Sequence, residues 1–540
     1  MARARHEAGD PRSAPLSDAQ QRTLLDEASR LRDAGDAAAA RQRLDEALRA
    51  EPRNGEAAAL MAALAADDGA FEEGMCWIER ALAAAPLAFA HYTRGRLLQG
   101  EGRLPEAAQS YQRSIELDPE RAAAWNNLGC VQHMQGQLDL AQASYRRALA
   151  LDPLLPQANQ NLSAIESDPA MAEGAVAGYR RQLERNPKDA QAHNNLGNVY
   201  RELGRHREAL ACFDAAIACD PGFAEARFSR SQELLLTGDF ERGWQDHESR
   251  WQVRGLGMAL PDLRGPLWEG EPLPGGTLLL HAEQGLGDTI QFARYAAMAA
   301  KRCGQVLLQC HPQIAGLLRE VPGLARVIPR GEPLPAFDAH LPVMSLPRVF
   351  GTTVQTIPWN GPYLRADPVL VERWRREREP AKGGAAARLH VGLAWAGRPQ
   401  YWDDRKRSIP LALFAPLARV GGVAFYSLQW GQGTDQLATA PASLRVRDFG
   451  DGIREFVEMA ALAASLDLVI SVDSSVAHLA GAMGRPVWLL IAHAPEWRWL
   501  LEREDTPWYP ATRLFRQSAP GDWPGVLERV AAELERLAAR

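Results

Sequence analysis

Six prolines recur at a nearly fixed interval in the first part of this 540-residue chain. The successive intervals are 34, 33, 34, 34 and 34 residues, between Pro52, Pro86, Pro119, Pro153, Pro187 and Pro221. A fixed period of this length is typical of a solenoid, in which each structural unit packs on its neighbours along the sequence. The period therefore predicts a stack of similar units, not one globular core.

Each interval contains two helical patterns of apolar residues, separated by a turn. Segments 124–153 and 192–221 align throughout, with turns at Gly136 and Gly204, and both end in Asp-Pro. Proline cannot continue a helix, so it marks the end of the second helix. The Leu-Gly, small-residue and closing proline positions resemble the tetratricopeptide repeat family.

This resemblance implies about six helix pairs over residues 19–221, of which the units ending at Pro52 and at 187 are more degenerate. A seventh unit at 224–251 is predicted to cap the stack, with Trp244 and Trp251 covering the last apolar face. The repeat region is therefore predicted at 19–251, after a polar tail at 1–18.

Three asparagines, Asn127, Asn161 and Asn195, recur at 34-residue spacing on the first helix of successive units. An amide side chain offers paired donors and acceptors, which suit an extended peptide backbone. If these asparagines line the concave surface, we expect a protein or peptide partner there. Alternatively, they cap or brace neighbouring helices.

The period ends before residue 275, where short β-rich runs begin to alternate with helical stretches. This alternation predicts a parallel sheet with helices on both faces. Two such sets are expected, a first half at 275–370 and a second half at 389–540, with a linker helix at 371–388 and a closing helix at 523–538. The predicted fold class is an α-solenoid followed by an α/β domain of two Rossmann-like halves that face a cleft. Ligands are expected outside the carboxyl ends of the strands.

The segment VISVDSSVAHLAGAMGRPVWLLI (469–491) predicts a buried strand ending at Asp473, then a helix that Ser474 or Ser475 caps. A helix N-terminus in this place stabilises anions. We therefore expect a phosphate at the two serines, sugar hydroxyls at Asp473, and a phosphate or ribose within reach of His478. Alternatively, the serines are plain caps and His478 is a packed core residue.

Three cations, Arg405, Lys406 and Arg407, follow the strand expected at 389–395 and precede a helix expected to start near Ile409. On a loop at the carboxyl end of a strand, such cations would neutralise a departing diphosphate. A solvated charged loop is the alternative. Lys406 stands out because the chain has only four lysines.

The segment HAEQGLGDTIQFARY (281–295) places Gly285 and Gly287 between a strand and a helix. It is not a dinucleotide fingerprint, because Ile290 replaces the third glycine of G-x-G-x-x-G. The glycines are predicted to form a tight turn that, with Gln284, leaves room for substrate. Asp288 would then meet an acceptor hydroxyl as a general base, or merely cap its own helix.

Three segments together resemble glycosyltransferase family nine, the heptosyltransferase-like enzymes, and especially its repeat-fused members: EQGLGDTIQFARY, KRSIP and VDSSVAHLAGAMGRPV. The resemblance covers about 275–520. It implies a GT-B fold and transfer of a sugar from a nucleotide-diphosphate sugar. It also implies Asp288 as the base, Lys406 as a diphosphate contact, and a donor site lined by Asp473, Ser474, Ser475 and His478. Trp497 and Trp499 either flank the nucleotide or pack in the core.

The family pattern has threonine and glycine where Ser474 and Ser475 stand, which leaves the donor sugar open. The absence of an Asp-x-Asp triplet predicts a transferase without a metal ion, and no cofactor is expected besides the sugar nucleotide. A net charge of −6 argues against nucleic-acid binding. No apolar run of about 18 residues and no secretory signal occur, so we expect a cytoplasmic protein without an integral membrane segment.

The leading hypothesis is a glycosyltransferase that acts on a protein or peptide hydroxyl presented by the repeats. One alternative is a tetratricopeptide scaffold whose transferase-like module is catalytically degenerate. Another is a nucleotide-sugar isomerase or hydrolase, which would give the repeats no task.

Overall fold

The computed structural model describes residues 17–33, 36–135, 137–152, 155, 157–158, 161–162, 169–253, 256, 258, 260–378, 387–397, 404–431, 433–453 and 455–539. The tail up to residue 16, Gly136 and Pro153 lie outside the described residues. The chain divides into two compact units, Met1–Glu166 and Ser167–Arg540.

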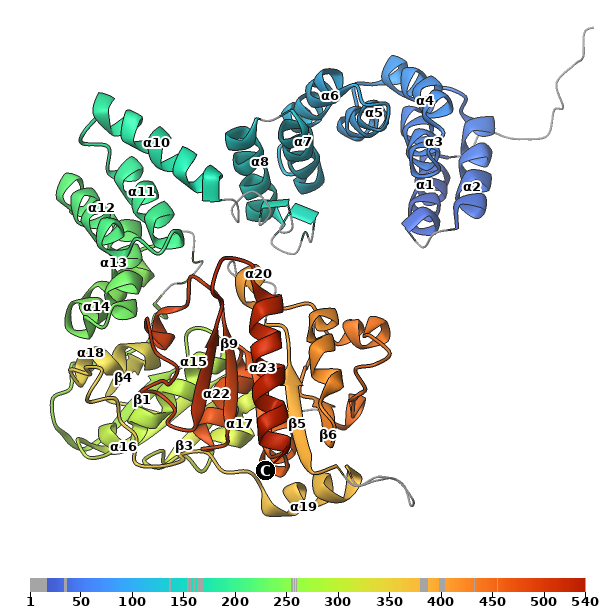
Figure 1. Ribbon diagram of the computed structural model, residues 1–540. Coiled ribbons are helices and arrows are strands. Elements are labelled where there is room, and N and C mark those ends of the chain that lie inside the picture. The colour runs from blue at the N-terminus through green and yellow to red at the C-terminus, as the bar shows by residue number, and fades with distance from the viewer. Residues whose placement is uncertain are drawn as a thin grey trace, which may run out of the picture. The chain divides into compact units, whose positions relative to one another are not determined.

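The first unit consists of helix pairs (Figure 1). Its helices are α1 (Asp18–Asp33), α2 (Ala37–Ala50), α3 (Gly55–Asp67), α4 (Phe71–Ala84), α5 (Ala88–Gly100), α6 (Leu104–Leu117), α7 (Ala122–Met134) and α8 (Leu138–Leu151). The second unit begins with further repeats: α10 (Pro169–Arg185), α11 (Ala190–Glu202), α12 (His206–Cys219), α13 (Ala224–Leu236), α14 (Phe240–His247) and the 3-10 helix η1 (Glu248–Trp251).

The prolines of the sequence period mark the ends of helices, as predicted. The second helix of a unit stops two residues before the proline, for example α2 at Ala50 before Pro52 and α12 at Cys219 before Pro221. The repeated glycine has a packing reason, because a Cβ at Gly129 would lie 2.7 Å from the Tyr145 ring and one at Gly197 would lie 2.5 Å from the Phe213 ring. The two helices of a pair can approach closely only where this side chain is missing.

The division between units falls inside the repeat series, at Ser167, and not at the predicted end of the repeats at 251. Helices α10 to α14 therefore belong to the same compact unit as both α/β halves. Trp244, which was expected to cover the last apolar face, is 2% exposed. It also packs beyond the repeats, because it shares one hydrophobic core with Phe292 of the first half and Trp497 of the second.

The first half contains a four-stranded parallel sheet of order β3-β2-β1-β4. Its strands are β1 (Leu273–His281), β2 (Cys303–Cys310), β3 (Arg326–Pro329) and β4 (Ala339–Pro342). Its helical segments are α15 (Leu286–Phe292), η3 (Ala293–Tyr295), α16 (Ala296–Ala299), α17 (Pro312–Leu318), η4 (Val343–Ser345) and α18 (Leu346–Val349). The predicted linker at 371–388 begins inside helix α19 (Pro368–Glu377). Its residues 379–386 lie outside the described residues.

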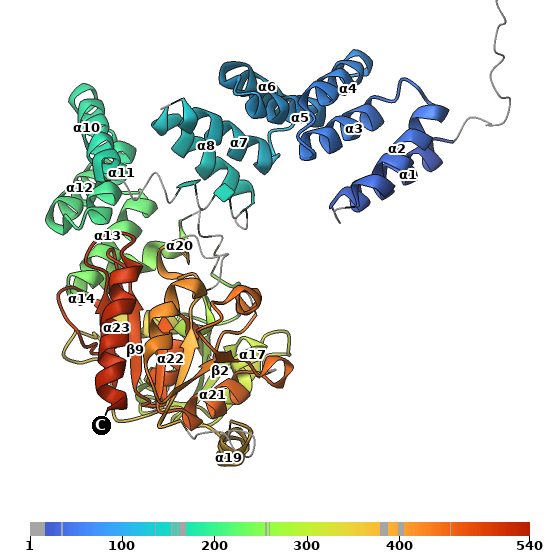
Figure 2. The ribbon, with the colours of Figure 1, turned by 45° about the vertical axis from the view of Figure 1, so that its right-hand side comes forward.

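The second half contains a six-stranded parallel sheet of order β10-β9-β8-β5-β6-β7. Its strands are β5 (Leu389–Ala394), β6 (Val423–Ser427), β7 (Val446–Arg447), β8 (Leu468–Val472), β9 (Val487–Ile491) and β10 (Thr512–Arg516). Its helical segments are α20 (Asp404–Arg407), η5 (Leu411–Arg419), η6 (Thr434–Thr439), η7 (Gly450–Gly452), α21 (Phe456–Ser465), α22 (Ser475–Ala482), η8 (Trp497–Trp499) and α23 (Trp523–Ala538). Helix α23 lies along this sheet (Figures 1 and 2).

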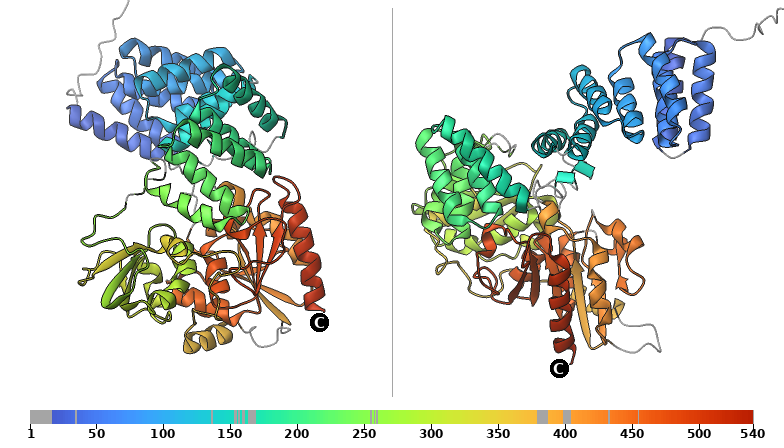
Figure 3. Two further views of the ribbon diagram at one scale, coloured as in Figure 1. Left: turned by 90° about the vertical axis from the view of Figure 1, so that its left-hand side faces the viewer. Right: turned by 45° about the horizontal axis from the view of Figure 1, so that its top comes forward.

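The predicted fold class is confirmed: repeats are followed by two doubly wound α/β halves, which lie side by side in the left view of Figure 3. Two local expectations were wrong. The helix expected from Ile409 is the 3-10 helix η5, which contains Pro416, and the cations expected on a loop lie on the short helix α20. In each sheet the first strand of the half lies between strands that follow it in sequence, so the strand order reverses there.

Candidate active site

The predicted site residues gather where the strand order reverses, at the carboxyl ends of the strands. Gln284 to Asp288 follow β1, Lys406 and Arg407 come after β5, and Asp473 follows β8. Helix α15 of the first half packs against α22 of the second. This position is where open α/β sheets bind ligands.

A small pocket opens at the carboxyl ends of β8 and β9. It combines cations with carboxylates, and it is lined by Lys406, Arg407, Asp473, Leu490, Ile491, Ala492, Ala494, Pro495, Glu496 and Trp499. Three of the predicted donor-site residues, Lys406, Arg407 and Asp473, therefore line one pocket. Ser474, Ser475 and His478 are not among its lining residues.

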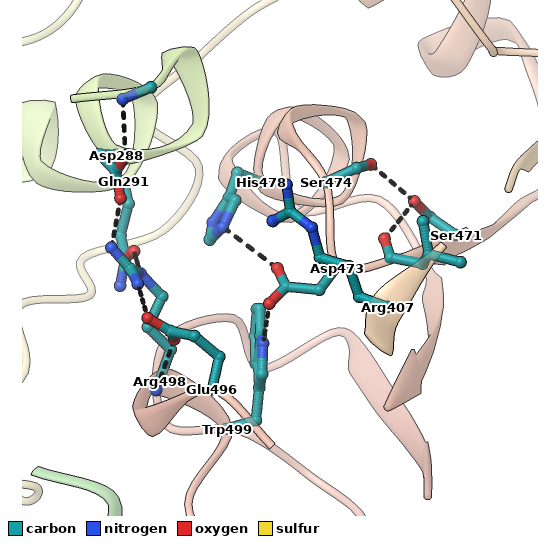
Figure 4. A network of polar contacts seen from close by, with 12 residues as sticks. Asp288, Gln291, Arg407, Ser471, Asp473, Ser474, His478, Glu496, Arg498 and Trp499 are labelled. Carbon is teal, nitrogen blue, oxygen red and sulfur yellow. Dashed lines mark hydrogen bonds and ion pairs between the residues drawn. The ribbon is translucent and has the colours of Figure 1, made fainter. Parts of the chain in front are cut away.

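Asp473 lies directly beyond β8 and is 8% exposed. Its Oδ2 accepts a hydrogen bond of 2.9 Å from the Trp499 indole, and its Oδ1 lies 3.8 Å from His478 Nε2 (Figure 4). These two contacts fix the orientation of the Asp473 carboxylate.

His478, 5% exposed, lies on α22 between the two halves. Its Nδ1 is 2.9 Å from the Tyr509 hydroxyl, its ring stacks on Trp499, and a Cβ at Gly287 would approach it to 2.8 Å. Burial lowers the pKa of His478 to about 3, so the ring is neutral near pH 7. The ring has the surroundings of a packed residue, and a phosphate or ribose contact stays a prediction.

Ser474 is the N-cap residue of α22, but its side chain does not cap the helix. Its Oγ lies 3.0 Å from Ser471 Oγ, while its backbone carbonyl accepts from the amides of Ala477 and His478. The expectation of a serine side-chain cap was therefore wrong for Ser474, because the hydroxyl turns back toward β8. Ser475 is the first residue of α22 and is half-buried.

Helix α20 is tied to the end of β5 through Asp404. Arg407 Nε donates to Asp404 Oδ1 at 2.9 Å, and Ser408 Oγ bonds Asp404 Oδ2 at 2.7 Å and accepts from the Gly397 amide. Lys406 Nζ instead reaches Glu202 Oε1, at the end of α11, at 2.6 Å. A repeat helix thus supplies a carboxylate to the Lys406 ammonium. The side chain of Arg405 lies outside the described residues.

Asp288 makes the capping contact considered from the sequence, and it also contacts the other half. Its Oδ2 accepts from the Gly285 amide at 2.9 Å, which caps the start of α15. Its Oδ1 pairs with Arg498 of the other half (Figure 4). Its side chain is 18% exposed, and its role as a general base stays a prediction.

The turn before Asp288 depends on one contact to its backbone and on the absence of a side chain at Gly287. The Gln284 carbonyl accepts from His311 Nε2 at 2.8 Å. Because the Cβ position of Gly287 nearly touches His478, a larger residue there would separate α15 from α22.

Arg498 and Glu496 were not singled out from the sequence. Arg498 is 6% exposed and bonds Asp288 and Gln291 of the first half as well as Glu496 of its own (Figure 4). Burial, aided by Asp473 and Asp288 and opposed by Arg498, raises the pKa of Glu496. The signal for these residues was PEWRW, in which an acid and an arginine alternate with tryptophans.

The two tryptophans of this segment have different surroundings. Trp499 lines the pocket, whereas Trp497 packs edge-on against Trp244 and Trp508. The segment WYPATRLFRQ (508–517) has a structural role, because the Trp508 carbonyl accepts from Arg294 and the Tyr509 hydroxyl lies within hydrogen-bond distance of His478.

The predicted asparagines contact neighbouring side chains of the repeats. The Asn127 amide lies 3.4 Å from the Tyr92 and Tyr111 hydroxyls, and the Asn161 amide contacts Asn126 at 3.4 Å. Asn195 accepts from Gln191. Bracing between helices is thus present at Asn127 and Asn161, and peptide binding stays a prediction.

The described residues contain no group of three or more His, Cys, Asp or Glu side chains arranged to hold a metal ion. In the same part of the chain, no helix has the length and apolar character needed to cross a membrane.

Comparison with known families supports this architecture. Tetratricopeptide repeat models match residues 25–89, 92–156 and 190–223. The model of glycosyltransferase family 9 (heptosyltransferase) matches residues 453–500. That segment runs from α21 to η8 and contains Asp473, His478, Glu496 and Arg498. The chain therefore carries tetratricopeptide repeats fused to a domain like that of glycosyltransferase family 9.

Among individual proteins, the chain is 29% identical over 368 residues to Protein FlbA of Caulobacter vibrioides, which covers 63% of this chain and 60% of FlbA. It is 31% identical over 90 residues to mouse Protein O-mannosyl-transferase TMTC1, which covers 16% of this chain and 10% of TMTC1. The solved structure of PilF from Pseudomonas aeruginosa covers 39% of this chain and 96% of its own, with 18% identity and a TM-score of 0.28.

Proposed function

We propose that this chain is a metal-independent glycosyltransferase that moves a sugar from a nucleotide-diphosphate sugar to a hydroxyl of a protein or peptide held by its repeats. The pocket beyond β8 and β9 carries the proposal, because it brings Lys406 and Arg407 together with Asp473 and Glu496. A sugar diphosphate needs both kinds of group, cations for the phosphates and carboxylates for the sugar hydroxyls. The match to family 9 covers the pocket's β8–β9 side.

The proposed reaction assigns one task to each side of the cleft. Asp288 takes the proton of the acceptor hydroxyl while the hydroxyl oxygen attacks the anomeric carbon of the sugar. The bond from that carbon to the phosphate oxygen breaks, and its electron pair leaves with the nucleoside diphosphate. Lys406 and Arg407 stabilise the charge of the leaving group, a role that fixed cations perform well in a partly dry site.

For Asp288 to act as a base, one of its oxygens must exchange a partner for the acceptor hydroxyl. The Gly285 amide belongs to the turn itself, so the Arg498 contact is the one that exchanges. Arg498 then retains Glu496 and Gln291 as partners. Binding of the acceptor would thus release a carboxylate that the Gly285 amide already orients.

A scaffold with a degenerate module is the second candidate, and the same contacts favour it. Both oxygens of Asp288 are engaged, and the ammonium of Lys406 is paired with Glu202. A site whose charges satisfy one another is stable without any ligand. This candidate predicts binding without turnover, whereas an isomerase or hydrolase predicts turnover that no acceptor accelerates.

The first test is a screen of the purified full chain against UDP-, GDP-, ADP- and dTDP-sugars, read by thermal shift and by donor hydrolysis in EDTA. We expect at least one donor to be hydrolysed slowly. Lys406→Ala should weaken binding of that donor about 10- to 100-fold, since a hydrogen bond to a charged group contributes about 1.5–3 kcal/mol. Lys301→Ala, an exposed lysine of the first half, is the control.

Turnover that EDTA abolishes would contradict the metal-free mechanism. A full panel without binding or hydrolysis would contradict the proposed function itself. Equal losses in the Lys406 and Lys301 variants would show that the cation of α20 does not touch the donor.

Replacement of Glu202 tests whether the repeat carboxylate competes with the donor for Lys406. We expect Glu202→Gln to tighten binding of nucleoside diphosphates about two- to fivefold, because a partly exposed ion pair contributes about 0–1 kcal/mol. Isothermal titration with UDP, GDP, ADP and dTDP measures this change. Glu208→Gln removes another repeat carboxylate that pairs with Arg205 and should change nothing. Weaker binding in Glu202→Gln would mean that Glu202 holds Lys406 in its productive place.

A further inference from the structure

The loop that leads from β1 to α15, the helix of Asp288, is held at three successive residues just beyond β1. The Ala282 carbonyl accepts from Arg330, and the Gln284 carbonyl accepts from His311. Both of these donors belong to the first half. The residue between them, Glu283, is held differently, because its partner comes from the repeat segment.

That partner is Arg250 of η1, at the end of the last repeat. Its Nη2 lies 3.2 and 3.0 Å from the two Glu283 oxygens and 2.8 Å from Ser345 Oγ. The Arg250 side chain is 0% exposed and that of Glu283 is 2% exposed. The pair is therefore sealed from water at the base of the loop.

Such a pair is poorly explained by stability alone. Two buried charges lose their hydration, and apolar residues of similar volume often stabilise a protein as well or better. Burial raises the pKa of Glu283 to about 7 in spite of the charge of Arg250. What the pair adds is direction, because one guanidinium nitrogen, Nη2, contacts both Glu283 oxygens and Ser345 Oγ. The other, Nη1, is fixed by Glu248 and His247.

The same repeat segment also packs against the segment that carries Arg498, the partner of Asp288. Arg250 Nη1 lies 3.3 Å from His247 Nδ1, and His247 packs edge-on against Trp244. Trp244 in turn packs edge-on against Trp497, the neighbour of Arg498 in sequence. The end of the repeats thus supports both the loop before Asp288 and the segment that carries its arginine partner.

We propose that Arg250 is a positioning residue for the transfer reaction: through Glu283 it fixes the turn 284–287 and so sets where Asp288 stands opposite the donor pocket. This inference rests on the proposed function for its catalytic part. It gives the last repeat a task in the chemistry itself, separate from holding an acceptor.

The test compares Arg250→Met, Arg250→Lys and the double variant Arg250→Met/Glu283→Leu with the wild type. The readout is hydrolysis of the best donor of the panel, in which water replaces the acceptor. The double variant removes both charges of the buried pair, and Glu248, whose side chain is 31% exposed, keeps its contacts with Ser345 and Arg348. We therefore expect its Tm to recover relative to Arg250→Met. Its kcat should stay about 10- to 100-fold low with KM for the donor nearly unchanged, as expected for a misplaced base. Arg250→Lys should recover part of the rate.

The matched control is Arg230→Met/Asp246→Leu, which removes another arginine–carboxylate pair of the same repeat, with distances of 2.6 and 3.1 Å. It should hydrolyse the donor at the wild-type rate. A double Arg250/Glu283 variant with wild-type kcat would overturn the proposal, and so would an equal loss in the Arg230 control.

Hydrogen–deuterium exchange of the peptide covering 283–292 separates this proposal from the proposed function. We expect faster exchange there in the double variant than in the wild type and the Arg230 control. If the wild type neither binds nor hydrolyses any donor, the proposed function fails, and exchange alone decides. Unchanged exchange would then overturn Arg250 as the anchor of the loop.

Discussion

Asp288→Asn is expected to reduce sugar transfer about 10²- to 10⁴-fold, which is the usual contribution of a general base. Asparagine keeps an oxygen for the Gly285 amide but cannot take a proton from the acceptor. Because Asp288 lies on α15 while the pocket lies beyond β8 and β9, the affinity for the donor should change little. Initial rates with a donor from the panel, together with calorimetric titration of that donor, measure both quantities.

The control is Asp338→Asn, since Asp338 also accepts a hydrogen bond from a backbone amide, that of Thr277 in the middle of β1, at 2.7 Å. This variant should retain full turnover. Full turnover in Asp288→Asn would instead mean that Asp288 only caps α15 and pairs with Arg498. Loss of donor binding in Asp288→Asn would point to a collapsed cleft and not to a missing base.

Trp244→Ala is expected to destabilise the α/β halves, although Trp244 belongs to the last repeat. Its indole donates to the Thr352 carbonyl at 3.1 Å and packs edge-on against Phe292 and Trp497. Removal of a buried tryptophan leaves a cavity and costs about 3–5 kcal/mol. That is a large part of the roughly 5–15 kcal/mol by which a domain is usually stable.

Calorimetry would measure this loss, and hydrogen exchange of peptides from β1 and α15 would locate it. Trp430→Ala is the matched control, since that tryptophan lies in the same unit but is 37% exposed, so a smaller effect is expected. Protection of β1 and α15 that is unchanged in Trp244→Ala would contradict the shared core. The repeats would then be a separable attachment, as the predicted boundary at 251 implied.

Much of the fold could be predicted from local patterns. The proline period marked the helix ends, and the apolar runs at β1, β2, β5, β6, β8 and β9 identified the central strands. Four strands were not predicted: β3, β4, β7 and β10. All four are edge strands, and β3, β4 and β7 have only two to four residues, which is too short for a pattern to emerge.

The candidate site was predictable only where its residues belong to a local sequence pattern. A strand that ends in Asp-Ser-Ser and a glycine turn before an acid are local signals, so Asp473 and Asp288 were found. Arg498 and Glu202 were missed, because each acts through a partner more than 200 positions away, with separations of 210 and 204 residues. No local pattern records such a pairing.

By itself, the sequence determined the repeats, the two α/β halves and the places where their strands end, because backbone conformation and burial follow short-range patterns of proline, glycine and apolar residues. Only the tertiary structure decided which charges meet. It placed Arg498 on Asp288, Glu202 on Lys406 and Arg250 on Glu283, and it drew the last repeats into the core of the transferase-like halves. The physical reason is that a buried charge selects its partner after the elements have packed, by distance and by exclusion of water.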